Sequence, residues 1–444
     1  MDDKRKAIWG WALYDWANSA FATTVMAGFF PIFFKQYWSA GTDVNVSTAQ
    51  LGFGNAAASL LVALMAPVLG AVADQGSAKK RFLMFFAYMG VLMTAALFFV
   101  QKGEWQWAIF IYAMGNIGFA GANIFYDALL PTVANSGNID FVSGAGYSLG
   151  YLGGGFLFLL NVLMTLMPEK FGLTDASQAV RYSFLTVALW WGGFAVFTAV
   201  WVPETRLPRS AEMPFGHMIR QGMRQFIRTF QEITRHRTAF LFLLAYWFYI
   251  DGVDTIIRMA VDYGISLGFA STDLIMALLI VQFVGFPAAL IFGKLGQKWS
   301  VRKSIYIAIC FYIFITIWGA FISSKDEFYI MAVCIGLVQG GLQALSRSYF
   351  ARFIPSGQSG EFFGFYNMLG KFAAIMGPAL MAVVGLTVKW MLMPPGAPLE
   401  QAEQISRIAS RASIASVALL FVIGLVLFYF VDERKGKQEA GSGV

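Results

Sequence analysis

The sequence contains few of the side chains that build disulfide frameworks, metal sites or water-exposed surfaces. Its 444 residues include two cysteines and two histidines, and only 13% of them are charged. Cys310 and Cys334 lie within apolar runs, so we expect inert thiols and no disulfide framework. His217 and His236 share one polar segment, which excludes a histidine metal cluster and a histidine proton relay inside a membrane. We therefore expect no metal and no cofactor.

Apolar residues are abundant instead and make up 58% of the chain. Soluble proteins are about 45–50% apolar and about 25% charged, so this composition excludes a soluble domain and a disordered chain. The net charge of +7 is expected to come from basic residues on cytoplasmic loops beside anionic lipid, not from nucleic-acid binding. The composition is therefore typical of a protein that crosses the bilayer many times.

Apolar runs of 18 or more residues predict twelve transmembrane helices. The predicted spans are 8–34, 49–73, 82–100, 105–130, 141–167, 182–202, 239–266, 273–294, 304–323, 328–351, 361–388 and 409–431. The basic start precedes a run that is too long and too polar for a cleaved signal peptide, so we expect an uncleaved first span.

Basic residues decide the expected orientation. If both termini are cytoplasmic, 22 Lys and Arg residues lie on cytoplasmic segments and 8 on the other side. The long cytoplasmic loop, residues 203–238, carries Arg220, Arg224 and Arg228 at helical spacing beside an apolar face. This pattern predicts an amphipathic helix on the inner leaflet that tethers two bodies; a calmodulin-like or nucleic-acid role for the stripe is a lesser alternative.

The two halves of the sequence resemble each other in the same order. Loop 70–80 matches loop 293–303, residues 121–150 match 341–370 through glycine and polar positions, and Asp15 to Ser19 matches Asp251 to Thr255. Such parallel repeats predict two six-helix bundles with a site between them.

The predicted domains are therefore an N-terminal bundle at 1–202, the linker at 203–238 and a C-terminal bundle at 239–444. The expected fold is an all-α membrane protein with twelve transmembrane helices in two parallel six-helix repeats.

Several motifs resemble a known family. The two matching loops are similar to the signature loop of the major facilitator superfamily, although Gln75 replaces its usual arginine and Gln297 an acid. The segments 11–21 (WALYDWANSAF), 125–131 (FYDALLP) and 251–259 (DGVDTIIRM), with the QALSRS segment that begins at Gln343, resemble the "unknown major facilitator" branch. That branch includes autophagy-associated vacuole effluxers. The resemblance implies a twelve-helix transporter, and its eukaryotic relatives imply amino-acid efflux.

Charged residues inside the predicted spans are the strongest functional signal, because each costs on the order of 2.5–3.5 kcal/mol at the bilayer centre. Asp251, Asp254, Arg258 and Asp262 fall on one stripe of a helix. We expect this stripe to face the bundle interior, where Arg258 pairs with an acid and the remaining acids bind substrate or an ion. An internal ion pair that only fixes packing is the alternative.

The other candidates lie on four further spans. The expected substrate- or ion-binding residues are Asp15, Asn18, Asn123, Tyr151, Asp251, Asp254, Arg258, Gln343, Tyr366, Asn367 and Lys371. For Asp15, near the inner end of its span, a gating role competes with substrate contact. The expected gating residues are Asp74, Asp127 and Arg347. Asp127 and Arg347 are repeat partners of opposite sign near the cytoplasmic ends, which predicts a salt-bridge latch.

These features favour an alternating-access secondary transporter for small zwitterions such as amino acids, with efflux preferred and possible proton coupling. One alternative is a proton-driven exporter of lipophilic compounds, which the mixed charges argue against. Another is a polytopic membrane enzyme, but the sequence contains no Walker loop, HExxH motif, paired Cys–His ligands or nucleophile elbow. The expected partners are the lipid bilayer, a small-molecule substrate and a coupling proton. We expect a monomer, in the plasma membrane if the source is bacterial.

Overall fold

The computed structural model describes residues 2–41, 44–76, 78–204, 231, 236–355, 357–394 and 398–441. Within these residues the chain forms helices joined by short turns, and no β-strand is present. The first half contains α1 (Asp3–Ala20), η1 (Phe21–Phe29), α2 (Phe30–Phe33), η2 (Phe34–Trp38), α3 (Val44–Gly76), α4 (Lys79–Ala96), η3 (Leu97–Phe99), α5 (Trp105–Val133), α6 (Ile139–Leu166), η4 (Pro168–Phe171) and α7 (Ala176–Trp201).

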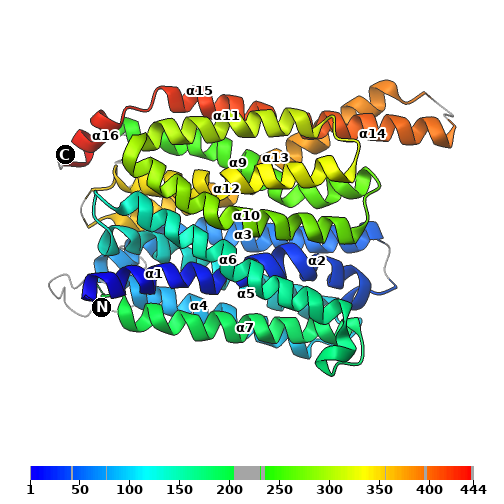
Figure 1. Ribbon diagram of the computed structural model, residues 1–444, viewed down its shortest axis with the longest axis horizontal. Coiled ribbons are helices and arrows are strands. Elements are labelled where there is room, and N and C mark those ends of the chain that lie inside the picture. Colours follow the sequence, from blue (N-terminus) through cyan, green and yellow to red (C-terminus); the bar gives the residue numbers. More distant parts are fainter. Residues whose placement is uncertain are drawn as a thin grey trace.

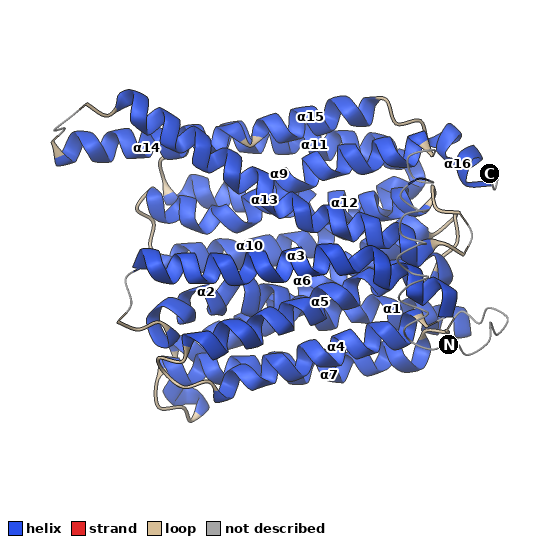
Figure 2. Cartoon of the chain, turned by 180° about the vertical axis from the view of Figure 1, so that it is seen from behind, coloured by secondary structure: helices blue, strands red, loops and turns tan. Residues whose placement is uncertain are grey.

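The second half repeats this pattern of long helices. It contains α9 (Arg237–Ser266), α10 (Ser271–Leu295), η5 (Gly296–Ser300), α11 (Val301–Gly319), α12 (Lys325–Ala351), α13 (Ser359–Leu392), α14 (Leu399–Ser416), α15 (Ala418–Tyr429) and α16 (Glu433–Gly441). The long helices lie side by side along one direction, and both chain ends lie at the same end of the molecule, which we call the termini end (Figures 1 and 2).

Nine stretches of the described chain are long and apolar enough to cross a membrane, and Thr272–Gly319 contains two successive helices. Shorter apolar segments at Ala57–Gly70 and Met376–Leu392 lie within α3 and α13. All twelve predicted spans therefore coincide with helices, and the predicted all-α membrane class is confirmed. The predicted linker helix lies outside the described residues, since 205–230 and 232–235 are not described.

Large apolar side chains cover the outside of the molecule. Leu64, Leu92 and Leu189 are 64%, 64% and 77% exposed, and many other apolar residues are exposed with them. Soluble proteins seldom present apolar surface on this scale. The exposed side chains are those that face lipid once the helices span a bilayer, because a helix satisfies its own backbone hydrogen bonds there.

The buried apolar side chains form two clusters, one from each half of the chain. The first cluster comes from residues 11–202 with Leu279 added, and the second from residues 239–431 with Ala128 added. Each half therefore buries its own core, and the two halves meet along a seam of paired helices. The most extensive contacts across the seam are those of α3 with α13 and of α6 with α10.

Glycines allow the closest approaches across this seam. A Cβ atom on Gly70 of α3 would overlap the carbonyl oxygen of Gly360 on α13. On the other helix pair, a Cβ on Gly144 of α6 would lie 3.0 Å from the Cα of Gly293 on α10. Glycine lets these backbones touch, as small residues do in other membrane helix pairs. Both contacts lie toward the termini end, which is consequently closed.

One helix differs from the prediction. Helix α14 begins at Leu399, ten residues before the predicted twelfth span, and α13 continues to Leu392. Together they form a helical hairpin that projects beyond the other helices at the end opposite the termini (Figure 1). The predicted span begins later than α14 because Glu400, Glu403 and Arg407 interrupt the run of apolar residues. A helix outside the hydrocarbon does not need apolar residues on every side.

Candidate functional site

Arg347 is the centre of the largest polar cluster between the two halves. It lies on α12 with 2% of its surface exposed, and its guanidinium is 3.1 Å from the Asp127 carboxylate of α5 and 3.6 Å from that of Asp15 on α1. One cation from the second half thus faces two acids from the first. The predicted pairing of Asp127 with Arg347 is present; a gating role for it stays a prediction.

Hydrogen bonds complete this arrangement. The Arg347 Nε donates to Ser143 Oγ at 3.0 Å, and its Nη2 donates to the Ser143 carbonyl oxygen at 3.1 Å. The Tyr126 hydroxyl donates to Asp15 Oδ2 at 2.7 Å, and Asn367 Nδ2 of α13 donates to Asp127 Oδ2 at 3.0 Å. A buried charge is tolerated when it is paired and hydrogen-bonded in this way.

Aromatic rings enclose the guanidinium. Its carbon lies 4.8 Å from the ring centroid of Trp11, 5.2 Å from that of Tyr126 and 4.5 Å from that of Tyr147. Trp11 and Tyr126 stack on each other at 4.3 Å. These cation–π contacts add attraction for a desolvated cation. We call the set of Asp15, Tyr126, Asp127, Ser143, Arg347 and Asn367 the Arg347 cluster.

A second polar contact joins the halves where α3 meets α13. Asp74 pairs with Lys79 at 2.6 Å, and its other carboxylate oxygen accepts the backbone N–H of Glu361 at 2.8 Å. Lys79 donates to Ser359 Oγ at 2.7 Å, and Ser359 donates to the Ala128 carbonyl oxygen at 3.0 Å. Asp74 thereby holds the first turn of α13, where a carboxylate is favoured by the helix dipole. The gating role predicted for Asp74 stays a prediction.

A third contact uses Arg352, just after α12. Its guanidinium binds Asp140 of α6 and also Glu433 of α16, the latter at 2.6 Å. Burial raises the pKa of Glu433, but the hydrogen bonds from Lys437 and Arg352 outweigh it and leave the pKa below its ordinary value of 4.5. The C-terminal helix is therefore connected through one arginine to the first half.

Other predicted residues lie deeper between the helices. Asn18 Nδ2 donates to Asn123 Oδ1 at 2.7 Å, which joins α1 to α5 within the first half. Tyr151 of α6 inserts its ring against Gly285 of α10 and Gly340 of α12. Tyr151 therefore lies at the seam, whereas the asparagine pair lies within the first half. Contact of these residues with substrate stays a prediction.

Asp251 is the most deeply buried acid of the stripe on α9. It is 0% exposed, and its Oδ1 accepts the backbone N–H of Gly377 at 3.0 Å and the Thr255 hydroxyl at 3.5 Å. Its Oδ2 has no hydrogen-bond partner among the described residues. Gly377 precedes Pro378, which cannot donate its own backbone hydrogen bond. Asp251 therefore binds α13 at a proline site instead of pairing with Arg258.

Arg258 itself is exposed and lies close enough to Tyr112 of α5 for an electrostatic interaction. Asp254 and Gln343 are half-buried, and Tyr366 stacks on Tyr246 with centroids 4.1 Å apart. Arg258 thus interacts across the seam with a residue of the first half.

Lys371 and Asp262 belong to α13 and α9, but their side chains lie outside the described part of the structure. Their predicted roles stay predictions.

Sequence reasoning missed several members of these contacts. It did not single out Ser143, Tyr147, Asp140 or Arg352, since a serine, a tyrosine or a charge at a helix end carries no distinctive pattern. Trp11 and Tyr126 belong to the segments 11–21 and 125–131 that resemble the family, but the sequence does not indicate their contact with a cation. Asn367 was grouped with Lys371 by sequence distance, yet it hydrogen-bonds Asp127 four helical residues nearer the termini end.

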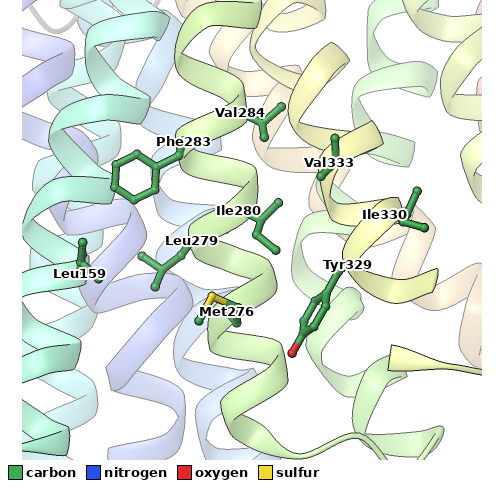
Figure 3. A pocket seen from close by; sticks show the side chains of 9 residues that line it. All are labelled: Leu159, Met276, Leu279, Ile280, Phe283, Val284, Tyr329, Ile330 and Val333. Atoms are coloured by element: carbon green, nitrogen blue, oxygen red, sulfur yellow. The ribbon is translucent and has the colours of Figure 1, made fainter. Parts of the chain in front are cut away.

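An apolar groove of about 550 Å³ lies elsewhere, between α6, α10 and α12 (Figure 3). Its lining is Leu159, Met276, Leu279, Ile280, Phe283, Val284, Tyr329, Ile330 and Val333. Met276 and Ile330 are 49% and 55% exposed, so the groove opens on the outer surface. It contains none of the buried charges and is separate from the site between the halves.

Solved structures identify the fold. The human organic anion transporter MFSD10 aligns with a TM-score of 0.70 at 13% identity, covering 96% of this chain and 100% of that chain. FucP, a major facilitator superfamily transporter in the outward conformation, aligns with a TM-score of 0.68 at 11% identity, covering 97% and 100%. The fold is that of major facilitator superfamily transporters.

Sequence comparison gives the family. The profile described as vacuole effluxer Atg22 like matches residues 3–50 and 39–385, and the chain belongs to this family. The MFS-type transporter YxiO of Bacillus subtilis is 37% identical over 427 residues, covering 96% of this chain and 94% of the relative. Autophagy-related protein 22 of Yarrowia lipolytica is 22% identical, covering 89% and 78%. The predicted family is confirmed, and the chain is a multi-pass membrane transporter, not an enzyme.

Proposed function

We propose that this transporter works by alternating access, with residues 1–202 and 239–444 as two rocking bodies and 203–238 as their tether. The observation that carries the proposal is the closure of one end by three polar contacts, those of Arg347, Asp74 and Arg352, while each half keeps its own core. Charged contacts between two separately packed bodies can be exchanged for water when the bodies separate. The termini end is the cytoplasmic side, in line with the bias of basic residues.

The substrate is a small zwitterion such as an amino acid, and efflux is the favoured direction. Arg258 offers a cation for a carboxylate, and Asp254 on the same helix face offers an acid for an ammonium group. A lipophilic substrate would not require both signs of charge. The relatives described as vacuole effluxers agree with export.

A proton is the coupling ion, and Asp251 carries it. The carboxyl group is 0% exposed, has one oxygen without a partner, and is bound to α13 through the other. An unpaired buried carboxylate is costly, so protonation favours this arrangement and deprotonation favours separation of α9 from α13 or access to water.

The test is uptake of labelled neutral amino acids into proteoliposomes under an imposed proton gradient. Wild type and Lys389→Gln, which changes an exposed residue at the end of α13, should transport equally. Arg258→Gln and Lys371→Ala should reduce the rate at least tenfold by removing a cation for the carboxylate. Asp251→Asn should retain counterflow exchange but lose the response to pH. Absence of flux above empty vesicles with any neutral amino acid would overturn the substrate assignment.

A further inference from the structure

A polar pocket lies at the termini end, away from the seam, where α16 returns to the start of α11. Its volume is about 530 Å³, and it is lined by Ser300, Arg302, Asp432, Glu433, Arg434 and Lys437. Three cations and two acids therefore face one hollow, and one of its acids, Glu433, also binds Arg352.

The two acids are already engaged by groups of the protein. Asp432 accepts the backbone N–H groups of Arg434 at 2.9 Å and of Lys435 at 3.4 Å, so it caps α16. Glu433 is bound by Arg352 at 2.6 Å and by Lys437 at 2.8 Å. Because these contacts direct both carboxylates toward protein donors, the hollow is left with a surplus of positive charge.

Arg302 gives the pocket a fixed wall. Its Nη2 donates to the Tyr429 carbonyl oxygen at 2.6 Å, and its guanidinium lies 5.8 Å from the Tyr306 ring centroid. Its Nε is buried without a hydrogen-bond partner among the described residues. An arginine held in this manner retains donors for a further acceptor, and a guanidinium matches the geometry of phosphate oxygens.

Aromatic rings beside the pocket indicate its depth in the membrane. Trp299, Tyr429 and Phe430 are 68%, 66% and 65% exposed. Trp299 directly precedes Ser300, and the other two lie within three residues of Asp432. Such rings occur at the level of lipid headgroups. The pocket also lies where α15 ends and α11 begins.

We propose that this pocket binds the phosphate of an anionic phospholipid headgroup, with Arg302, Arg434 and Lys437 as its ligands. A phosphodiester at this depth meets three cations on one side, and its acyl chains extend along the exposed apolar faces of α11 and α15. The lipid is favoured over free phosphate because exposed aromatic residues flank the lining residues in sequence. The site stands whether or not the proposed substrate is correct.

The site has a consequence for the seam. Lys437 and Arg352 share Glu433, and Arg352 also binds Asp140 of the first half. A phosphate that attracts Lys437 leaves Glu433 to Arg352 alone, which strengthens that pair relative to the Arg352–Asp140 contact. Lipid bound here therefore loosens one of the three contacts at the termini end.

The test measures binding of phosphatidylglycerol to the purified full chain by native mass spectrometry and by the shift of the unfolding temperature. Arg434→Gln is compared with Lys435→Gln, because Lys435 lies on the same helix but does not line the pocket. A cation near the membrane surface contributes enough that Arg434→Gln should lower the affinity about fivefold, while Lys435→Gln should leave it unchanged. Phosphatidylcholine and inorganic phosphate should each stabilise the wild type far less.

Equal affinity in the two variants would mean that diffuse charge attracts the lipid, and the proposal would be wrong. Equal stabilisation by inorganic phosphate would replace the lipid by a free anion. If Arg434→Gln does not fold, wild-type protein is irradiated with phosphatidylglycerol that carries a photoreactive headgroup. Cross-links within residues 432–437 support the site, and their absence from this segment contradicts it.

Discussion

At the scale of single residues, the molecule concentrates its buried charge on Arg347. Its guanidinium pairs with two carboxylates from the other half. It also donates a hydrogen bond to Ser143 and lies against three aromatic rings. A buried ion pair adds little to stability compared with apolar packing, but loss of one partner is costly. Such an arrangement is therefore better suited to specifying one closed state than to stabilising the fold as a whole.

This view leads to a charge-swap prediction. Asp127→Arg or Arg347→Asp alone should cost about 3–5 kcal/mol in the closed state, because each leaves like charges buried together. Transport in proteoliposomes should fall at least tenfold in either variant. The double variant, Asp127→Arg with Arg347→Asp, should recover part of the activity; Asp15 keeps the recovery below wild type. A double variant as inactive as both single variants would remove the gating role.

At the scale of elements, glycine contacts decide how closely the helices of the two halves approach. Gly70 faces the backbone of α13, so no side-chain rotation can make room for a Cβ atom. Gly144 and Gly293 likewise allow the backbones of α6 and α10 to come into contact. The closed end therefore depends on backbone contact along two helix pairs. The charged contacts of Arg347, Asp74 and Arg352 lie toward the same end.

Gly70→Ala tests this directly. The added methyl group should hold α3 and α13 apart and shift the population toward a state open at the termini end. Reaction of a single cysteine at Ser359 with a water-soluble maleimide should become at least several-fold faster, since this position is buried in the closed state. Gly193→Ala is the matched control, because a Cβ there meets nothing within 4 Å. An unchanged labelling rate in Gly70→Ala would count against the contact as a determinant of closure.

At the scale of the whole molecule, the two halves have separate cores and meet along several helix pairs, with their buried charged contacts gathered toward the termini end. The three contacts centred on Arg347, Asp74 and Arg352 all lie toward the termini, whereas Arg258 is exposed farther along α9. The proposed mechanism treats the two cores as bodies that move between two arrangements. On that proposal, the termini end opens during each transport cycle.

A cross-link across this end should therefore stop transport. Gln297 Nε2 donates to the Gly137 carbonyl oxygen at 3.1 Å, so Gly137→Cys with Gln297→Cys places two thiols near each other across the halves. In a background without Cys310 and Cys334, a short thiol cross-linker should abolish uptake, and a cleavable version should allow recovery after reduction. Lys80→Cys with Glu204→Cys is the control, because both residues belong to the first half. Full activity of the cross-linked Gly137–Gln297 pair would exclude rocking at this end.

Much of the fold was predictable from the sequence, since hydrocarbon imposes a strong and local requirement on each spanning segment. The twelve predicted spans all coincide with helices, and the start of α14 was missed only where the chain is amphipathic. The pairing of Asp127 with Arg347 was also predictable, because repeat partners of opposite sign lay at equivalent depths.

The composition and the order of apolar runs alone determined that this chain is an all-helical membrane protein, because each span satisfies its backbone within itself. The tertiary structure alone decided which charges meet. Asp15 and Asn367 joined Arg347 and Asp127, and Asp251 bound the backbone of α13 instead of Arg258. The physical reason is that partners across the seam are set by the rotation and depth of whole helices. Those quantities depend on contacts such as Gly70 with Gly360, which join residues hundreds of positions apart.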